Sequence, residues 1–139
     1  PQSDGVTVRM RFRDGSTTLE TANHYEHCSA TVQSDSSSWT IKNVNNDDNM
    51  QIGRDNMGHS GATSGISGII FVNDPQSSTN YANIHYELKS ADGDGFTLYK
   101  TLGSGAYKSA TTAVEGFELT CSSNGFTSGR IDIFGVKNA

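Results

Sequence analysis

Short segments in which apolar and polar residues alternate constrain the fold of this chain more than any other feature. The cleanest example lies at residues 81–89. Its apolar residues occupy every second position: Ala82, Ile84, Tyr86 and Leu88. A β-strand places successive side chains on opposite faces, so this period of two indicates a strand with one buried and one solvated face. Similar segments recur roughly every 8–12 residues, which predicts a β-sandwich or a barrel.

Several other segments carry the same pattern. Residues 6–13 alternate apolar side chains with Thr7 and three arginines, which predicts a first strand with a core face and a basic face. Residues 23–32 predict a second strand, with Cys28, Ala30 and Val32 expected to face the core. Shorter strands are predicted at residues 50–53, 66–72 and 96–99, the last with Phe96 and Leu98 facing the core.

The polar stretches between these segments are typical of loops. Residues 43–49 are almost wholly Asn and Asp, so their turn chemistry predicts a loop. Residues 53–65, which contain His59, are expected to form a long surface loop. Pro75 has no backbone N–H to give to a ladder, and should therefore end the strand at residues 66–72.

The end of the chain, residues 114–136, is typical of two strands joined by a turn. In the first strand Phe117, Leu119 and Cys121 share one face, which is expected to be buried. An Asn-Gly pair at 124–125 tolerates positive φ and predicts the turn.

The final predicted strand is apolar on both faces. Ile131 and Ile133 share one face, while Phe134 and Val136 lie on the other. Either Gly135 marks a bulge or both faces are covered. Exposed apolar residues on a strand favour aggregation, and symmetric assembly removes that hazard. Phe134 and Val136 are therefore predicted to lie at an oligomer interface.

Composition limits the classes of protein to consider. The chain of 139 residues is long enough for a single domain, residues 1–139, with one core. Only 33% of its residues are apolar and 15 are Gly, which suits short strands joined by polar loops. A net charge of −5 disfavours nucleic-acid binding, so Arg9, Arg11 and Arg13 are expected to form the outer face of a strand. No apolar run reaches the ~20 residues that cross a bilayer, and no signal peptide is recognisable, so membrane insertion is not expected.

Five stretches, distributed along nearly the whole chain, carry a family resemblance. They are residues 8–15 (VRMRFRDG), 49–53 (NMQIG), 69–74 (IIFVND), 105–119 (GAYKSATTAVEGFEL) and 125–137 (GFTSGRIDIFGVK). With Lys89 in the strand after the third stretch, they resemble β-sandwich domains of tailed-bacteriophage structural proteins, such as tail fibre, tail appendage or minor virion proteins. The resemblance implies a domain on the virion surface, assembled in the bacterial host cytoplasm, that binds a host receptor, often a glycan, or decorates the particle. It brings no catalytic motif.

The chain departs from this family at two places. Family members usually carry a Trp where this chain has Tyr107, and they begin with a further strand, with an Ile-Pro turn, that is missing ahead of Pro1. If that first strand is absent, one sheet edge is open and must be paired by another chain or by upstream residues.

No metal or other cofactor is expected. His24 and His27 lie three residues apart, which on a strand directs them to opposite faces, so they do not converge on one ion. The acidic pairs Asp47-Asp48 and Asp92-Gly93-Asp94 do not fit a calcium-binding loop, and turn chemistry explains them better.

Cys28 and Cys121 both lie on faces that are expected to be buried. A disulfide between them would stabilise the fold by up to about 4 or 5 kcal/mol in the chain-entropy model, but the sequence does not show that the sulfurs meet. The reducing cytoplasm that the resemblance implies favours two buried thiols.

No catalytic residues are predicted. Gly103-Ser104-Gly105 lacks the strand-to-helix context of a nucleophile elbow, and the carboxylates are scattered among loops without a recognisable acid/base pair. Candidate ligand-contacting residues are Trp39, Asn45, Asn46, His59 and Tyr107. Trp39 and Tyr107 could stack on a sugar ring, although large aromatic side chains are more often buried.

The expected fold is therefore all-β, an antiparallel β-sandwich of jelly-roll type. The expected role is that of a non-enzymatic virion surface protein, a homotrimer that contacts other virion proteins and a host-surface glycan. A secreted carbohydrate-binding module is the alternative from another class. A hydrolase on the same scaffold has the least support.

Overall fold

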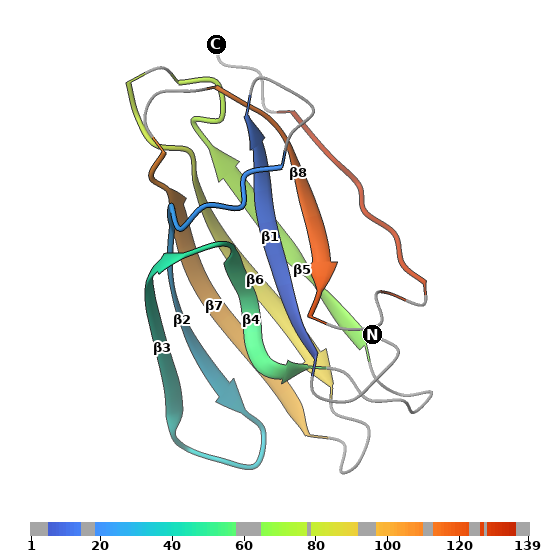
Figure 1. The fold of residues 1–139 in the computed structure, drawn as a ribbon. Helices are drawn as coiled ribbons and strands as arrows, with labels where there is room; N and C mark the ends of the chain where they lie inside the picture. The colour runs from blue at the N-terminus through green and yellow to red at the C-terminus, as the bar shows by residue number, and fades with distance from the viewer. Residues whose placement is uncertain are drawn as a thin grey trace.

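The structure, a computed structural model, describes residues 6–14, 19–57, 65–77, 79–91, 97–109, 113–122, 126 and 128–135. These residues form two antiparallel sheets packed as a β-sandwich, which confirms the all-β prediction (Figure 1). The strands are β1 Val6–Asp14, β2 Tyr25–Gln33, β3 Trp39–Asp47, β4 Met50–Met57, β5 Gly65–Asn73, β6 Asn83–Ala91, β7 Leu98–Tyr107 and β8 Val114–Cys121.

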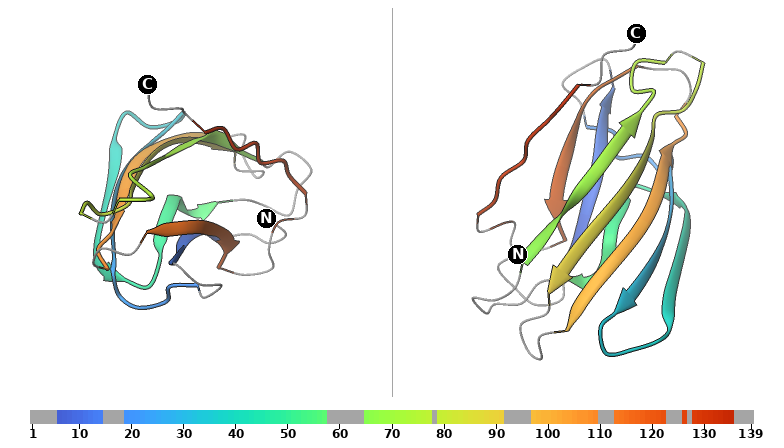
Figure 2. Two further views of the ribbon diagram at one scale, coloured as in Figure 1. Left: turned by 90° about the horizontal axis from the view of Figure 1, so that it is seen from above. Right: turned by 180° about the vertical axis from the view of Figure 1, so that it is seen from behind.

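One sheet has three strands in the order β4-β1-β8, and the other has five in the order β3-β2-β7-β6-β5. The chain passes from the larger to the smaller sheet through the tight turn at Asp48 and Asn49, between β3 and β4. The edge strands β5 and β8 lie on the same side of the sandwich (Figure 2).

Both sheets contribute to one hydrophobic core. Its buried side chains include Val8, Met10, Phe12, Met50, Ile52 and Met57 from the three-stranded sheet, and Tyr25, Ile84, Tyr86, Leu88 and Tyr107 from the five-stranded sheet. The predicted core faces of residues 6–13 and 81–89 are therefore confirmed. The predicted strands at residues 50–53 and 66–72 are confirmed as parts of β4 and β5.

Aromatic rings close one end of this core. The Tyr107 ring lies 5.1 Å from the Tyr25 ring and 6.0 Å from the Phe12 ring, measured between centroids. The Tyr25 hydroxyl accepts a hydrogen bond from the Phe12 amide at 2.9 Å and donates to the Glu20 carbonyl at 3.2 Å. The Tyr107 hydroxyl donates to a Glu20 carboxylate oxygen at 3.1 Å. The phenol groups are thus satisfied although their rings are buried, and burial raises the pKa of Tyr25 well above its ordinary value.

The predicted orientation of the second strand is wrong. Tyr25 and His27 face the core, whereas Cys28 is exposed on the opposite face. Both faces of this strand carry apolar residues, so alternation alone does not select one. Pairing of Tyr25 with Tyr107 places two large rings together inside, and burial of that area outweighs burial of the smaller side chains on the other face.

The two cysteines do not meet. Cys28 lies on the outside of the five-stranded sheet and Cys121 lies on β8 of the other sheet, so both are free thiols, as predicted. Burial raises the pKa of the Cys121 thiol, which makes it a poor nucleophile at neutral pH. The prediction that both thiols are buried is wrong for Cys28.

The predicted loop at residues 43–49 is also wrong, because residues up to Asp47 belong to β3. The tolerance of Asn for turn conformations nevertheless shapes this stretch. Asn46 has a φ of 55°, and the register between β2 and β3 shifts beside it, which marks a bulge in an edge strand. Likewise, β4 continues to Met57 where a loop was predicted from Gly53 onward. His59 lies outside the described residues.

Three large apolar residues are exposed on the surface instead of being buried in the core. Leu98 opens β7 and is exposed, against the prediction, and Trp39 and Ile41 of β3 are exposed as well. Phe96 lies outside the described residues. The five-stranded sheet therefore carries apolar side chains on both of its faces.

The predicted final strand is not formed. Residues 129–135 are extended but belong to no sheet, and they run along the side of the sandwich where the edge strands β5 and β8 lie (red in Figures 1 and 2). Ile131, Ile133 and Phe134 are exposed. Gly135 is therefore not a bulge in a described sheet, and Val136 and the Asn-Gly turn lie outside the described residues.

Candidate functional site

The side of the five-stranded sheet that faces away from the three-stranded sheet, here called the outer face, carries most of the described candidate residues. The strand register places Ile41, Ala30 and Leu102 next to one another across β3, β2 and β7. Glu87 of β6 and Ile69 of β5 continue the same row. The result is an apolar band across the whole sheet, interrupted only by a carboxylate.

More exposed apolar and basic side chains flank this band on the side of the β2–β3 turn. Trp39 is 51% exposed at the start of β3, and Leu98 is exposed at the start of β7. Lys100 lies two residues after Leu98 on β7, and its Nζ is 3.1 Å from a Glu87 oxygen. An open depression of about 620 Å³ at this end includes Leu98 and Lys100 in its lining.

On the other side of the band lies an open hollow of about 640 Å³, here called the amide hollow. Its polar lining comes from Glu26, Cys28, Asn43, Asn45, Asn83 and Ser104. Cys28 and Ser104 are direct neighbours across β2 and β7, with 3.3 Å between sulfur and oxygen. The hollow exists because these central residues have short side chains, while longer amides stand on the neighbouring strands.

A stacked ring pair borders the amide hollow. The Phe71 and His85 rings lie 4.4 Å apart with their planes inclined by 14°. His85 is the register partner of Ser104, so the ring pair continues the row that crosses the hollow. Asn73 donates a hydrogen bond from its amide to the Asn83 oxygen at 3.1 Å, which orients the Asn83 amide. An oriented amide beside an exposed flat ring suits a polar ligand that also has an apolar face.

The predicted ligand residues are only partly brought together. Trp39 and Asn45 lie on the same strand and face, but six residues apart, which is roughly 20 Å along a strand. Asn46 sits in the bulge, where its side-chain oxygen accepts a hydrogen bond from Lys108 at 3.4 Å. Tyr107 is 1% exposed and hydrogen-bonded inside the core, so it offers no surface for stacking.

The residues that line or border the hollow were not predicted as site residues: Cys28, Asn43, Asn83 and Ser104 line it, and Phe71, Asn73 and His85 border it. The alternation in residues 81–89 did place Asn83 and His85 on the solvent side. What was lacking was the order of the strands, since these residues come from β2, β3, β5, β6 and β7.

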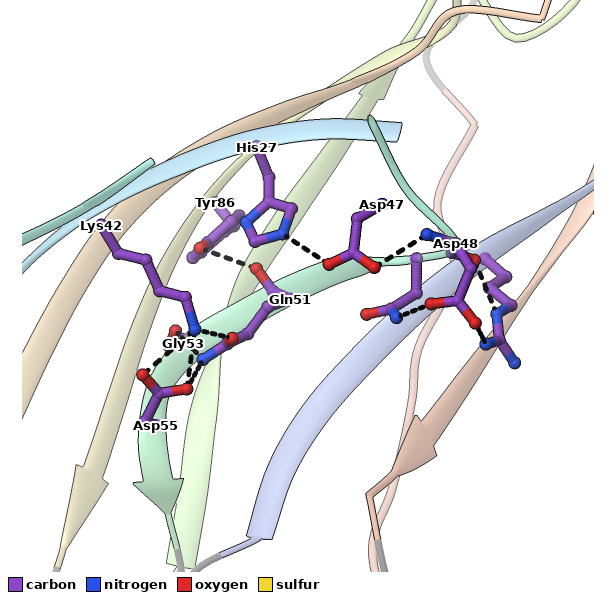
Figure 3. Close-up of polar contacts among 10 residues, drawn as sticks. His27, Lys42, Asp47, Asp48, Gln51, Gly53, Asp55 and Tyr86 are labelled. Carbon is purple, nitrogen blue, oxygen red and sulfur yellow. Dashed lines mark hydrogen bonds and ion pairs between the residues drawn. The ribbon is translucent and has the colours of Figure 1, made fainter. Parts of the chain in front are cut away.

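A second polar region ties the two sheets together near β2, β3 and β4 (Figure 3). Lys42 of β3 donates to both carboxylate oxygens of Asp55 on β4, at 2.8 and 3.1 Å, and also bonds the Gln51 side chain. The Gln51 amide donates to Asp55 at 2.7 Å. Burial opposes ionisation of Asp55, but these bonds outweigh it and lower the pKa of Asp55.

Asp48, in the turn from β3 to β4, is held by β1. Arg11 donates to the Asp48 carbonyl at 2.9 Å and to its carboxylate at 2.6 Å, and the Asn49 amide bonds the other carboxylate oxygen. Burial opposes ionisation here too, but the Asn49 bond and the Arg11 charge outweigh it and lower the pKa of Asp48. The middle arginine of the predicted basic face thus fixes the turn between the sheets.

His27 is the buried titratable group of this region. Its Nε2 lies 3.6 Å from an Asp47 carboxylate oxygen, and in the described part of the chain neither ring nitrogen has a hydrogen-bond partner. Burial lowers the pKa of His27, although Asp47 opposes that effect. Its side chain is 1% exposed, so no substrate bound at the surface reaches it.

This burial predicts how stability depends on pH. Because the pKa of His27 is lower in the folded chain, the unfolded chain binds the proton first, and the free energy of unfolding should fall as pH decreases from 6.5. The contribution is at most about 1.4 kcal/mol per pH unit. Lys42 and Asp55 also act on His27. The pKa values of Asp48 and Asp55 are lowered, so the stability linked to these two carboxylates is lost only below their ordinary pKa of 3.8.

Urea unfolding at several pH values between 5 and 7 would measure this slope, and we expect His27→Gln to reduce it. His85→Gln is the matched control, since that imidazole is in contact with water in both states. If wild-type protein and His27→Gln had equal slopes, protonation of His27 would not be coupled to unfolding.

Among the described residues, the remaining histidines and carboxylates form no larger constellation. His24 Nδ1 lies 4.0 Å from Glu20, and its ring lies 6.3 Å from Tyr107. Within the described residues no three His, Cys, Asp or Glu side chains gather as metal ligands, and no helix is long and apolar enough to span a membrane. The outer face, not the polar region between the sheets, is the candidate functional site.

Comparison of the whole chain with protein-family models, with curated proteins and with solved structures finds no match.

Proposed function

We propose that this domain is a non-enzymatic structural protein of a tailed-bacteriophage virion surface. It would serve in a tail fibre or appendage that recognises the host, or as a decoration of the capsid. The resemblance of its sequence segments to virion β-sandwich domains supports this role. The observation that carries it is the composition of the outer face.

The solvent-facing side of an antiparallel sheet is normally polar. Here Trp39, Ile41, Ile69, Phe71 and Leu102 are all exposed on that side. Soluble monomers rarely expose apolar side chains gathered on one surface, and such surfaces usually mark a binding partner. In the proposed role the outer face contacts a neighbouring virion protein or a host-surface glycan.

The proposal includes self-association as a homotrimer, assembled in the host cytoplasm and displayed on the particle. The free thiols of Cys28 and Cys121 agree with assembly in a reducing compartment. The exposed Phe134 supports a contact between copies near the end of the chain.

We retain the jelly-roll type as part of the proposal. The pairs β1–β8 and β2–β7 are nested, as expected when a long hairpin is rolled into two sheets, and this supports it. The pairing of β3 with β2 and of β5 with β6 departs from a complete roll.

Immuno-electron microscopy tests the virion role. An antibody against the domain, applied to intact particles from the producing culture, is expected to label their surface. Label at the tail end would support host recognition, and label over the shell would support decoration. Particles without label, in a culture that contains the protein, would contradict the proposal.

A secreted carbohydrate-binding module remains the second candidate because of the amide hollow. The Phe71–His85 ring pair could cover the apolar face of a sugar while Asn43, Asn45 and Asn83 bond its hydroxyls. We expect Asn83→Ala to weaken glycan binding at least tenfold on a glycan array, with Lys89→Ala, outside the hollow on the same strand, as control. Glycan binding by an isolated monomer, with no label on particles, would favour this candidate over the virion role.

A further inference from the structure

One edge of the three-stranded sheet is open. On the side of β8 away from β1, no strand within the described residues pairs with it. Phe117 and Leu119 of β8 lie opposite Phe12 and Met10 of β1 and point toward the core with them. The two β1 side chains are at most 1% exposed, whereas the two β8 side chains are only half-buried. The open edge therefore leaves part of the core uncovered.

The other sheet adds to the same opening. Its edge strand β5 lies on this side of the sandwich (Figure 2), and Ile66, Ile70 and Val72 of β5 pack against the core while remaining partly exposed. An uncovered strand edge beside half-buried apolar side chains is a site for strand addition.

The end of the chain offers a strand that fits this site. The segment 130–134 is extended, lies outside both sheets and alternates two isoleucines with charged residues. Ile131 is 64% exposed, Ile133 is 75% exposed and Phe134 is 86% exposed. Arg130 and Asp132 share the opposite side of the segment, with 2.9 Å between Nε and Oδ1.

We propose that residues 130–134 of one copy of this chain add to β8 of a second copy, as an antiparallel fourth strand of its three-stranded sheet. Ile131 and Ile133 would then face inward and extend the half-buried row that Phe117 and Leu119 begin. The N–H and C=O of Val114 at the start of β8 already bind Pro75 and Gln76. The added strand would supply partners for the outward-facing N–H and C=O groups of β8 beyond Val114.

Charge favours one register of this pairing over the register that is shifted by two residues toward the end of β8. When Ile131 lies opposite Phe117, Arg130 lies opposite Glu118 and Asp132 opposite Gly116. Glu118 is already the register partner of Arg11 on its other side, so it would sit between two arginines. A shift of two residues would instead place Asp132 opposite Glu118, and like charges directly opposite one another destabilise a sheet.

The occupant is a second copy because each chain presents both halves of the contact and its own segment does not occupy its own edge (Figures 1 and 2). A head-to-tail contact whose rotation closes forms a ring, and in such a ring every β8 edge is covered. A ring of three agrees with the proposed homotrimer. The inference rests on the self-association part of the proposed function and not on the virion role.

Disulfide trapping tests the contact. In a chain with Cys28→Ser and Cys121→Ser, two single variants are made, Glu118→Cys and Arg130→Cys, then unfolded together, refolded and oxidised. Residues directly opposite in an antiparallel pair have Cα atoms about 4.5–5.5 Å apart, within the range of a disulfide. We expect a covalent dimer of one chain of each variant, and at least tenfold less of it when Lys89→Cys, on the outer face of the other sheet, replaces Glu118→Cys.

Two results would overturn the inference. One is an equal yield of dimer with Lys89→Cys. The other is a cross-link that forms only within single chains when Glu118→Cys and Arg130→Cys are combined in one chain, since the segment would then pair with its own β8.

Light scattering gives an independent measurement of self-association. The Ile133→Lys change, at an exposed position, should raise the Kd of self-association at least tenfold and leave the circular dichroism spectrum unchanged. Unlabelled virions together with trapped dimers would contradict the virion role alone.

Discussion

Replacing Phe12 by Ala is expected to bring the domain close to unfolding at room temperature. Phe12 is completely buried, its ring meets the Tyr107 ring edge-on, and its amide is bound by the Tyr25 hydroxyl. Truncation of a buried Phe to Ala costs about 3–5 kcal/mol, because apolar transfer energy is lost and a cavity remains. The whole free energy of unfolding of a domain is only about 5–15 kcal/mol.

Urea unfolding followed by circular dichroism, under reducing conditions, would measure this loss as a lower transition midpoint. Phe71→Ala is the matched control, because Phe71 is 45% exposed on the outer face and its loss should cost about 1 kcal/mol or less. A loss for Phe12→Ala no larger than that for Phe71→Ala would mean that the end of the core is not packed as described.

The second large effect is expected for Gly103→Ala. A Cβ atom at Gly103 would clash with Cζ and Oη of Tyr86, which is buried and directly opposite on β6. The Tyr86 hydroxyl donates to the Gln51 carbonyl of the other sheet at 3.3 Å, so displacing the ring also weakens a link between the sheets. We expect a loss of roughly 2–4 kcal/mol from overpacking and the disturbed hydrogen bond.

Gly65→Ala serves as the control for Gly103→Ala, since a Cβ atom at Gly65 of β5 meets nothing within 4 Å. Its effect should stay within about 0.5 kcal/mol. A second test combines Gly103→Ala with Tyr86→Leu, which makes room for the new methyl group. The double variant should lose less stability than the sum of the single changes. Additive losses would show that the ring does not pack on Gly103.

These two variants test two different reasons why a particular residue is needed at a position in the core. Phe12 supplies apolar area, and the sequence pattern alone identifies it. Gly103 is required by the side chain opposite it on β6, and no local pattern reveals that neighbour. Gly103, Ser104 and Gly105 all lie within β7, and Gly103 is the register partner of Tyr86.

The candidate site depends even more on distant neighbours. Trp39 and Asn45 were singled out from the sequence, and the structure places both on the outer face. The Phe71–His85 pair and the short side chains that form the hollow come from strands far apart in the chain. Residue type gave no signal for them, since Ser104 and Cys28 are unremarkable until the register makes them neighbours.

The sequence by itself determined the strand character of this protein and the inward faces of β1 and β6. In those strands apolar residues occupy one face only, and the hydrophobic effect then leaves a single choice. The tertiary structure decided the orientation of β2, in which Tyr25 and His27 are buried in the core and Cys28 is exposed. It also left residues 129–135 outside both sheets. Alternation with a period of two shows that successive side chains lie on opposite faces of a strand. Where both faces carry apolar residues, the partner strand decides which face is buried.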